Sequence, residues 1–115
     1  MIKRTKQFAV DVWRMCSNLP HSREYNSYVN QLLRCSSSVA ANYRAVSRAK
    51  SKADFLNKLK IVEEEADESQ FFLEILDEIN SSRNLSSEIK RLIKEADEIV
   101  AIIVSSIKTS RSSLY

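Results

Sequence analysis

The side chains with the clearest capacity for chemistry are five carboxylates grouped near the middle of the chain. They are Glu63, Glu64, Glu65, Asp67 and Glu68. Helical bundles use such carboxylates to hold two metal ions, but those centres also need a Glu-x-x-His pair on each of two helices. The chain has one histidine, His21, so we expect no metal site and no cofactor. Either Glu65 or Glu68 is expected to reach inward and pair with an arginine such as Arg34, while the others face solvent.

Nucleophilic catalysis also lacks its components. A serine or cysteine nucleophile needs a positioned base and a third group that orients the base. The one histidine, His21, lies between Pro20 and Ser22, a predicted helix N-cap, so we expect it in a surface turn. The sequence contains no glycine from which a phosphate-binding loop could be built. We therefore predict that the protein is not an enzyme, and no small-molecule substrate is implied.

The two cysteines, Cys16 and Cys35, are predicted to be reduced residues in or near the core. In an antiparallel helix pair they would differ in axial height by about 15 Å, at about 1.5 Å per residue. A disulfide requires Cα atoms within about 7 Å of each other. A bridge or a metal-binding pair is therefore not expected.

The elements that must position these side chains are helices. Apolar residues recur three, four or seven positions apart in two long segments, which is the helical period. They are Tyr25, Val29, Leu32, Val39, Tyr43 and Val46, followed by Phe55, Leu59, Val62, Ala66, Leu73 and Leu76. Ser51 precedes Asp54 by three positions, a pattern like the capping box that begins a helix.

We predict an all-α, up-down-up-down four-helix bundle that forms a single domain over residues 1–115, with a first helix shorter than the others. The predicted helices span roughly residues 3–18, 22–48, 52–80 and 86–110. No apolar run approaches the ~18 residues that cross a membrane. The first residues are amphipathic rather than uniformly apolar, unlike a signal peptide. The expected location is the cytoplasm.

Charge is distributed unevenly, although the net charge is only +3. Between residues 44 and 60 there are six cations and one carboxylate, Asp54, and between residues 63 and 78 there are eight carboxylates and no cation. We call the six cations the basic cluster. They are Arg44, Arg48, Lys50, Lys52, Lys58 and Lys60. In the predicted bundle this cluster lies at the same end as both termini, where Lys3, Arg4 and Lys6 add positive charge.

The basic cluster is a candidate surface for RNA or DNA, held through phosphate contacts. Lys3, Arg4 and Lys6 favour this hypothesis, because cations at a helix N-terminus oppose its dipole by a few tenths of a kcal/mol each. An acidic patch on a partner protein is the alternative ligand. A solvated surface with no partner is the third interpretation.

Helix lengths predict that the chain assembles with copies of itself. A first helix of about 16 residues covers about 24 Å, whereas a second of about 27 residues covers about 40 Å. The end of the second helix would then expose apolar side chains unless another subunit covers them. The candidate interface residues are Val39, Tyr43, Val46 and Phe55.

Several short motifs carry a resemblance to a known family. They are Gln31 with Arg34, the small residues ending at Ser38, Asn42, the Ser51-Lys52 helix start, Phe55-Leu56, Phe8-Ala9 with Val12, and Leu19-Pro20. On these residues the chain resembles the four-helix-bundle family first noticed in reading frames within intervening sequences of bacterial 23S ribosomal RNA genes. It departs from the family at Tyr43-Arg44-Ala45-Val46, where many members have Ile-Ala-Glu-Gly, and at Glu64, where many have glycine.

The resemblance implies a ring-shaped pentamer, and similar bundles serve as accessory proteins to the reverse transcriptases of diversity-generating retroelements. Our leading hypothesis is a non-enzymatic, homo-oligomeric bundle that binds nucleic acid or a ribonucleoprotein through its basic end. The alternative is a protein-interaction or structural module without affinity for nucleic acid. A ligand-binding bundle is less well supported, because the sequence offers no convergent polar groups.

Overall fold

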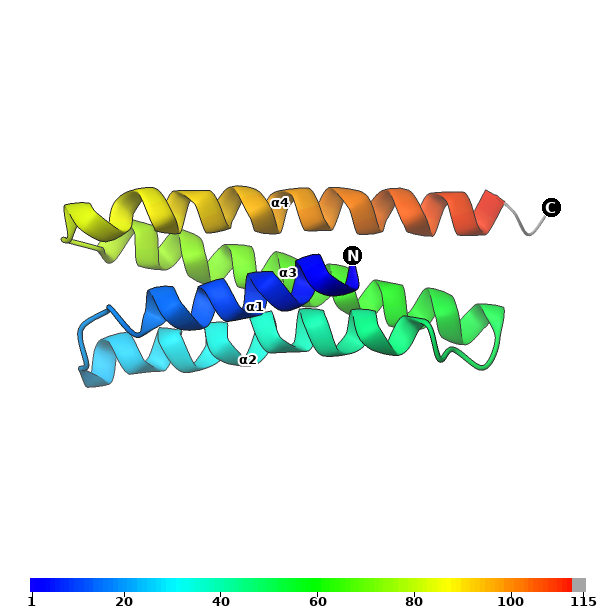
Figure 1. Cartoon of the computed structure of the whole chain (residues 1–115), viewed down its shortest axis with the longest axis horizontal. Coiled ribbons are helices and arrows are strands. Elements are labelled where there is room, and N and C mark those ends of the chain that lie inside the picture. The colour runs from blue at the N-terminus through cyan, green and yellow to red at the C-terminus, as the bar shows by residue number, and fades with distance from the viewer. Residues whose placement is uncertain (113–115) are drawn as a thin grey trace.

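The computed structural model describes residues 1–112, which form four α-helices. They are α1 (Ile2–Cys16), α2 (Arg23–Val46), α3 (Lys52–Ile79) and α4 (Arg83–Ser112). Consecutive helices run in opposite directions (Figure 1). Neighbours in the chain pack together and α1 also contacts α4, whereas no Cα atoms of the diagonal pairs α1–α3 and α2–α4 lie within 8 Å of each other. The predicted all-α, up-down-up-down bundle is confirmed.

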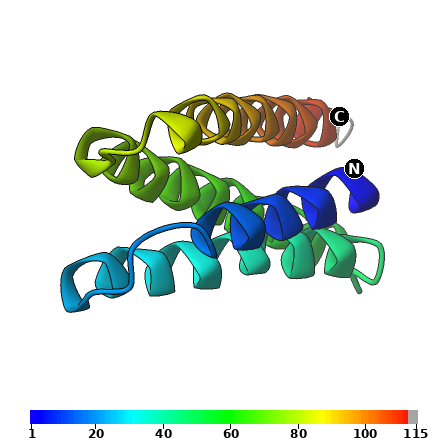
Figure 2. The same cartoon turned by 60° about the vertical axis from the view of Figure 1, so that its left-hand side comes forward.

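The first helix is the shortest, as predicted: α1 has 15 residues, whereas α2, α3 and α4 have 24, 28 and 30. In Figures 1 and 2, α1 lies between α2 and α4 and begins well short of the turn that joins α2 to α3. One end of the bundle is therefore built from three helices. We call it the open end.

Serine side chains determine where two of the helices begin. The Ser22 hydroxyl oxygen accepts a hydrogen bond from the Tyr25 N–H at 3.1 Å, and that of Ser51 accepts one from the Asp54 N–H at 3.0 Å. Both predicted N-caps are thus present, and such a cap contributes about 1 kcal/mol. The Asp54 carboxylate accepts from the Lys50 N–H, one residue earlier than in a regular capping box.

Two helices end earlier than predicted, α1 at Cys16 and α2 at Val46. In both cases the chain continues for one tight turn with hydrogen bonds between residues three apart, as in Leu19 N–H to Cys16 carbonyl at 3.1 Å. None of the described residues has a positive φ. The turns are therefore made entirely from conformations that any L-amino acid can adopt.

All four helices contribute to one apolar core, represented by Phe8, Leu32, Leu73 and Ile99, each at most 1% exposed. Both cysteines are buried and free, which confirms that prediction. Burial raises the pKa of the Cys16 thiol to about 12. Among the described helices, none is both long enough and apolar enough to span a bilayer.

Candidate nucleic-acid and assembly surfaces

The basic cluster surrounds the turn between α2 and α3, at the open end of the bundle. Arg44, Arg48 and Lys50 are exposed, and no carboxylate of the described residues lies within ion-pair distance of their side chains. Arg48 and Lys50 lie in the turn itself. They are the members of the cluster best placed to meet an anion.

Two other members of the cluster are neutralised on their own helix. The Lys58 Nζ lies 2.7 Å from the Asp54 carboxylate, and the Lys60 Nζ lies 3.8 Å from Glu63. The hydrogen bond from Lys58, with a smaller contribution from the Lys50 N–H, lowers the pKa of the Asp54 carboxyl. The Lys52 Nζ lies 5.9 Å from the centroid of the Phe55 ring, within cation–π range.

Arg4 does not add to the positive surface, contrary to the sequence-based expectation. Its guanidinium donates two hydrogen bonds of 2.8 Å to Glu95 and one of 3.1 Å to Glu98. These bonds raise the pKa of Arg4 and fasten α1 to α4. The two lysines near it, Lys3 and Lys6, have no carboxylate partner among residues 1–112.

Three of the four predicted interface residues lie beside hollows at the open end. A hollow of about 450 Å³ lies next to the start of α1, and one of about 500 Å³ lies between the α2–α3 turn and α4. Tyr43 lines the first, Phe55 lines the second, and Val46 lines both. Val39 is the exception. It is 0% exposed in the core of one chain, so it offers no surface to a second chain, and its assignment to an interface was wrong.

A groove between α1 and α2 was not anticipated from the sequence. It has a volume of about 620 Å³ and combines small side chains with two cations. We call it the α1–α2 groove. Its lining residues are Ile2, Lys6, Ala9, Ser37, Ala40, Ala41 and Arg44. The repeated spacing of three or four positions in both helices was a signal that could have identified it.

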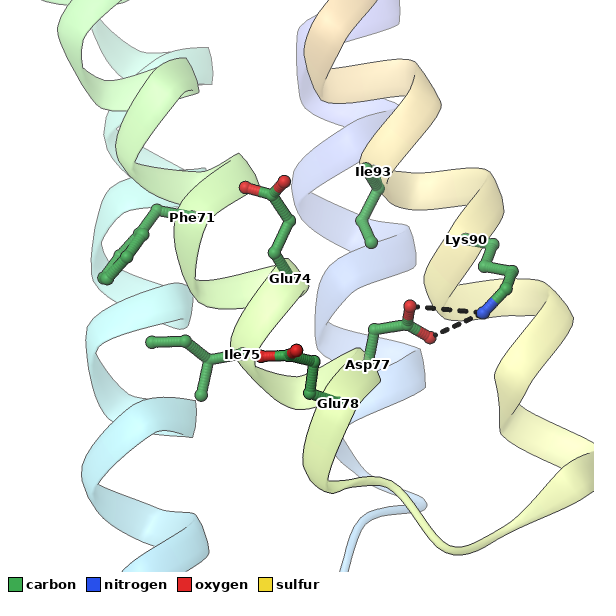
Figure 3. Close-up of a pocket in the computed structure, with 7 residues that line it drawn as sticks. All are labelled: Phe71, Glu74, Ile75, Asp77, Glu78, Lys90 and Ile93. Carbon is green, nitrogen blue, oxygen red and sulfur yellow. Dashed lines mark hydrogen bonds and ion pairs between the residues drawn. The ribbon is translucent and has the colours of Figure 1, made fainter.

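A second groove, of about 590 Å³, follows the outer side of α3 next to α4. Figure 3 shows Phe71, Glu74 and Glu78 projecting from α3. Asp77 is neutralised, since the Lys90 Nζ lies 3.0 and 3.1 Å from its two oxygens. No cation in the described part of the chain pairs with Glu74 or Glu78. Phe71 is 55% exposed.

The acidic run is partly engaged by Arg34, as predicted. The Arg34 guanidinium pairs with both Glu65 and Glu68, and also donates to Gln31 at 3.2 Å. Glu65 turns partly inward, with 20% of its side chain exposed, whereas the Glu68 and Arg34 side chains are 36% and 50% exposed, so the pair lies at the edge of the core rather than within it. Over residues 1–112, no group of three or more His, Cys, Asp or Glu side chains is arranged to hold a metal ion.

Comparison with known proteins agrees with the resemblance seen in the sequence. Residues 1–105 match a family model described as 23S rRNA-intervening sequence protein. Among solved structures, the chain is similar to a protein with unknown function from the S23 ribosomal protein family of Bacteroides thetaiotaomicron VPI-5482. The two share 30% sequence identity with a TM-score of 0.82, over 93% of this chain and 97% of the other. No curated protein sequence matches the chain.

Proposed function

The chain belongs to the 23S rRNA-intervening sequence protein family, and on that premise we propose that it is a non-enzymatic, homo-oligomeric module that binds nucleic acid or a ribonucleoprotein. The grouping of unpaired cations around the open end supports this proposal, since Lys3, Lys6, Arg44, Arg48 and Lys50 all lie there without a carboxylate partner among residues 1–112. Arg4, Arg34 and Arg91 are each tied to carboxylates of a neighbouring helix. Arg48 and Lys50, at the open end, have no such partner in the described structure.

Unpaired cations grouped at one end of a helical bundle are suited to phosphate groups. Arginine and lysine side chains bind phosphate oxygens and release the counterions that surround a nucleic acid. Such contacts position the ligand but do not read its bases. The proposed binding is therefore largely independent of sequence and sensitive to salt.

Assembly would present the basic cluster several times over. The hollows at the open end leave Tyr43 and Phe55 only partly buried, and another chain would cover these apolar side chains. We prefer a pentamer because of the family resemblance. In a ring, a long polyanion engages several clusters at once, so its apparent affinity exceeds that of a short one.

The test is a length and salt series on RNA and DNA with the purified protein. Binding should weaken as salt rises and strengthen with polymer length. Reversing Arg48, Lys50 and Lys52 to Glu should abolish binding while helicity and assembly persist. Absence of wild-type binding at low salt, where phosphate contacts are strongest, would refute the proposal.

A matched control makes the same change in net charge away from the open end. The variant Arg14→Glu, Arg83→Glu, Lys94→Glu reverses three exposed cations that have no carboxylate partner among residues 1–112. It should retain most of the wild-type affinity. If both triple variants lose affinity equally, net charge rather than the basic cluster determines binding.

The alternative function is a protein-interaction or structural module without affinity for nucleic acid. The exposed Phe71 beside the unpaired Glu74 and Glu78 favours it, because an aromatic ring among carboxylates suits a protein partner better than a polyanion. The same binding series separates the two functions, since this alternative predicts no binding at any salt concentration.

A further inference from the structure

Five residues form a line along the outer face of α3. They are Glu64, Asp67, Phe71, Glu74 and Glu78, and we call them the acidic stripe. Spacings of three and four positions place them on one side of the helix. All five residues are exposed. None of the four carboxylates in the acidic stripe forms an ion pair with another described residue.

The acidic stripe is unfavourable in an isolated chain for two reasons. Like charges three or four positions apart on a helix repel each other. At its centre, Phe71 leaves 55% of its surface in contact with water. A concave surface that combines apolar side chains with cations would relieve both effects.

The chain itself carries such a surface in the α1–α2 groove. Ala9, Ala40 and Ala41 have small side chains that leave room in this groove for a bulky one, and Lys6 and Arg44 supply positive charge with no carboxylate partner among residues 1–112. The lengths also agree. The segment of α3 from Phe71 to Glu78 and the segment of α2 from Ser37 to Arg44 each extend about 10 Å along the helix axis, at about 1.5 Å per residue.

The two surfaces cannot meet within one chain. The acidic stripe faces outward from α3, whereas the groove lies between α1 and α2, and α3 is diagonally across the bundle from α1. We propose that the acidic stripe of one chain docks into the α1–α2 groove of a second copy. Phe71 then packs on the alanines, and Glu74 and Glu78 pair with Lys6 and Arg44.

This contact joins two different surfaces of the chain, so each copy can receive one neighbour and dock onto another. The stripe lies on the outer side of α3 next to α4, and the groove lies between α1 and α2, so the two surfaces face in different directions. A contact of this heterologous kind closes into a ring when the rotation between neighbouring copies completes a full turn, and otherwise forms a filament. The contact rests on the oligomeric part of the proposed function. It assigns Arg44 to assembly and leaves Arg48 and Lys50 for phosphate.

The test uses charge reversal on each side of the contact, with mass measured by sedimentation. Glu74→Lys with Glu78→Lys should lower the mass toward the 13.2 kDa of one chain. Lys6→Glu with Arg44→Glu should do the same. Each double variant should raise the concentration at which the assembly dissociates at least about tenfold, because like charges across an interface oppose association. The four changes together should restore assembly, since the charges are again complementary.

Two controls accompany these variants. Asp97→Lys reverses an exposed carboxylate on α4, outside both surfaces, and should leave the mass unchanged. Circular dichroism should show wild-type helicity in every variant, because all of the changed side chains are exposed.

The outcomes separate this contact from the proposed function. A wild-type assembly whose mass is unchanged by both double variants would mean that a different partner covers the acidic stripe, and it would overturn the contact alone. Failure of the fourfold variant to reassemble would overturn the pairing of these two surfaces. A wild-type monomer at every concentration would overturn the contact and the oligomeric part of the function. Nucleic-acid binding is tested separately, by measuring the affinity of the variant in which Arg48, Lys50 and Lys52 are reversed to Glu.

Discussion

Truncating Phe55 measures whether the open end is covered by another chain. Phe55 lies near the start of α3 and is only partly buried in one chain, whereas Leu59, one turn later, is 2% exposed. Truncation of a buried leucine or phenylalanine to alanine costs about 2 to 5 kcal/mol of unfolding free energy. Leu59→Ala should therefore cost about 2 to 5 kcal/mol at every protein concentration. Phe55→Ala should cost on the order of 1 to 2 kcal/mol in the isolated chain, because part of the ring is already hydrated.

The cost of Phe55→Ala should rise to about 3 to 5 kcal/mol when a second chain covers the ring. The assay is urea unfolding followed by circular dichroism, at one concentration where sedimentation shows dissociated wild-type protein and one where it shows the assembly. Leu59→Ala serves as the control for the bundle core. Equal costs of Phe55→Ala at both concentrations would refute its place in an interface, and a cost of Leu59→Ala well under 1 kcal/mol would refute the packing described for this end.

Two further predictions concern titrating groups. The Asp54 carboxyl has a lowered pKa in the folded chain, so its stabilising effect is present above its unfolded pKa of about 3.9 and is lost as pH falls through the lower folded value. Asp54→Asn should therefore reduce thermal stability at pH 7, and this deficit should shrink as pH falls below the unfolded pKa of about 3.9; an unchanged deficit at low pH would show that the charge is not responsible. The Cys16 thiol, with its pKa raised to about 12 by burial, should react with iodoacetamide at pH 8 far more slowly in native than in urea-unfolded protein. Similar rates in the two states would contradict its burial.

The helical architecture was predictable because its signals are local. Apolar periodicity identifies the buried side of each helix, and Ser22 and Ser51 mark helix starts by bonds that reach only three residues. The ends of α1 and α2 were misplaced because the chain passes into a tighter turn that periodicity does not distinguish from a helix. That transition depends on backbone bonds such as Leu19 to Cys16.

The candidate sites were predictable only in part, because free charge depends on partners that are distant in the sequence. Lys58 and Asp54 are four residues apart, and their pairing could have been foreseen from the helix period. Arg4 meets Glu95 across 91 positions, which no local pattern reveals. Val39 was misassigned for a related reason. Its helical spacing indicates a buried side but does not say whether the burial comes from the same chain or another.

The turns of this bundle also bear on its denatured ensemble. Every described turn residue has a negative φ, and the chain contains no glycine. Glycine has the greatest backbone freedom before folding and loses the most on being ordered. At a compatible turn position, a residue other than glycine is worth about 0.4 to 1 kcal/mol, chiefly through this conformational entropy. Part of the free energy of unfolding therefore arises from the lower conformational entropy of the unfolded chain. This contribution does not correspond to any contact in the folded structure.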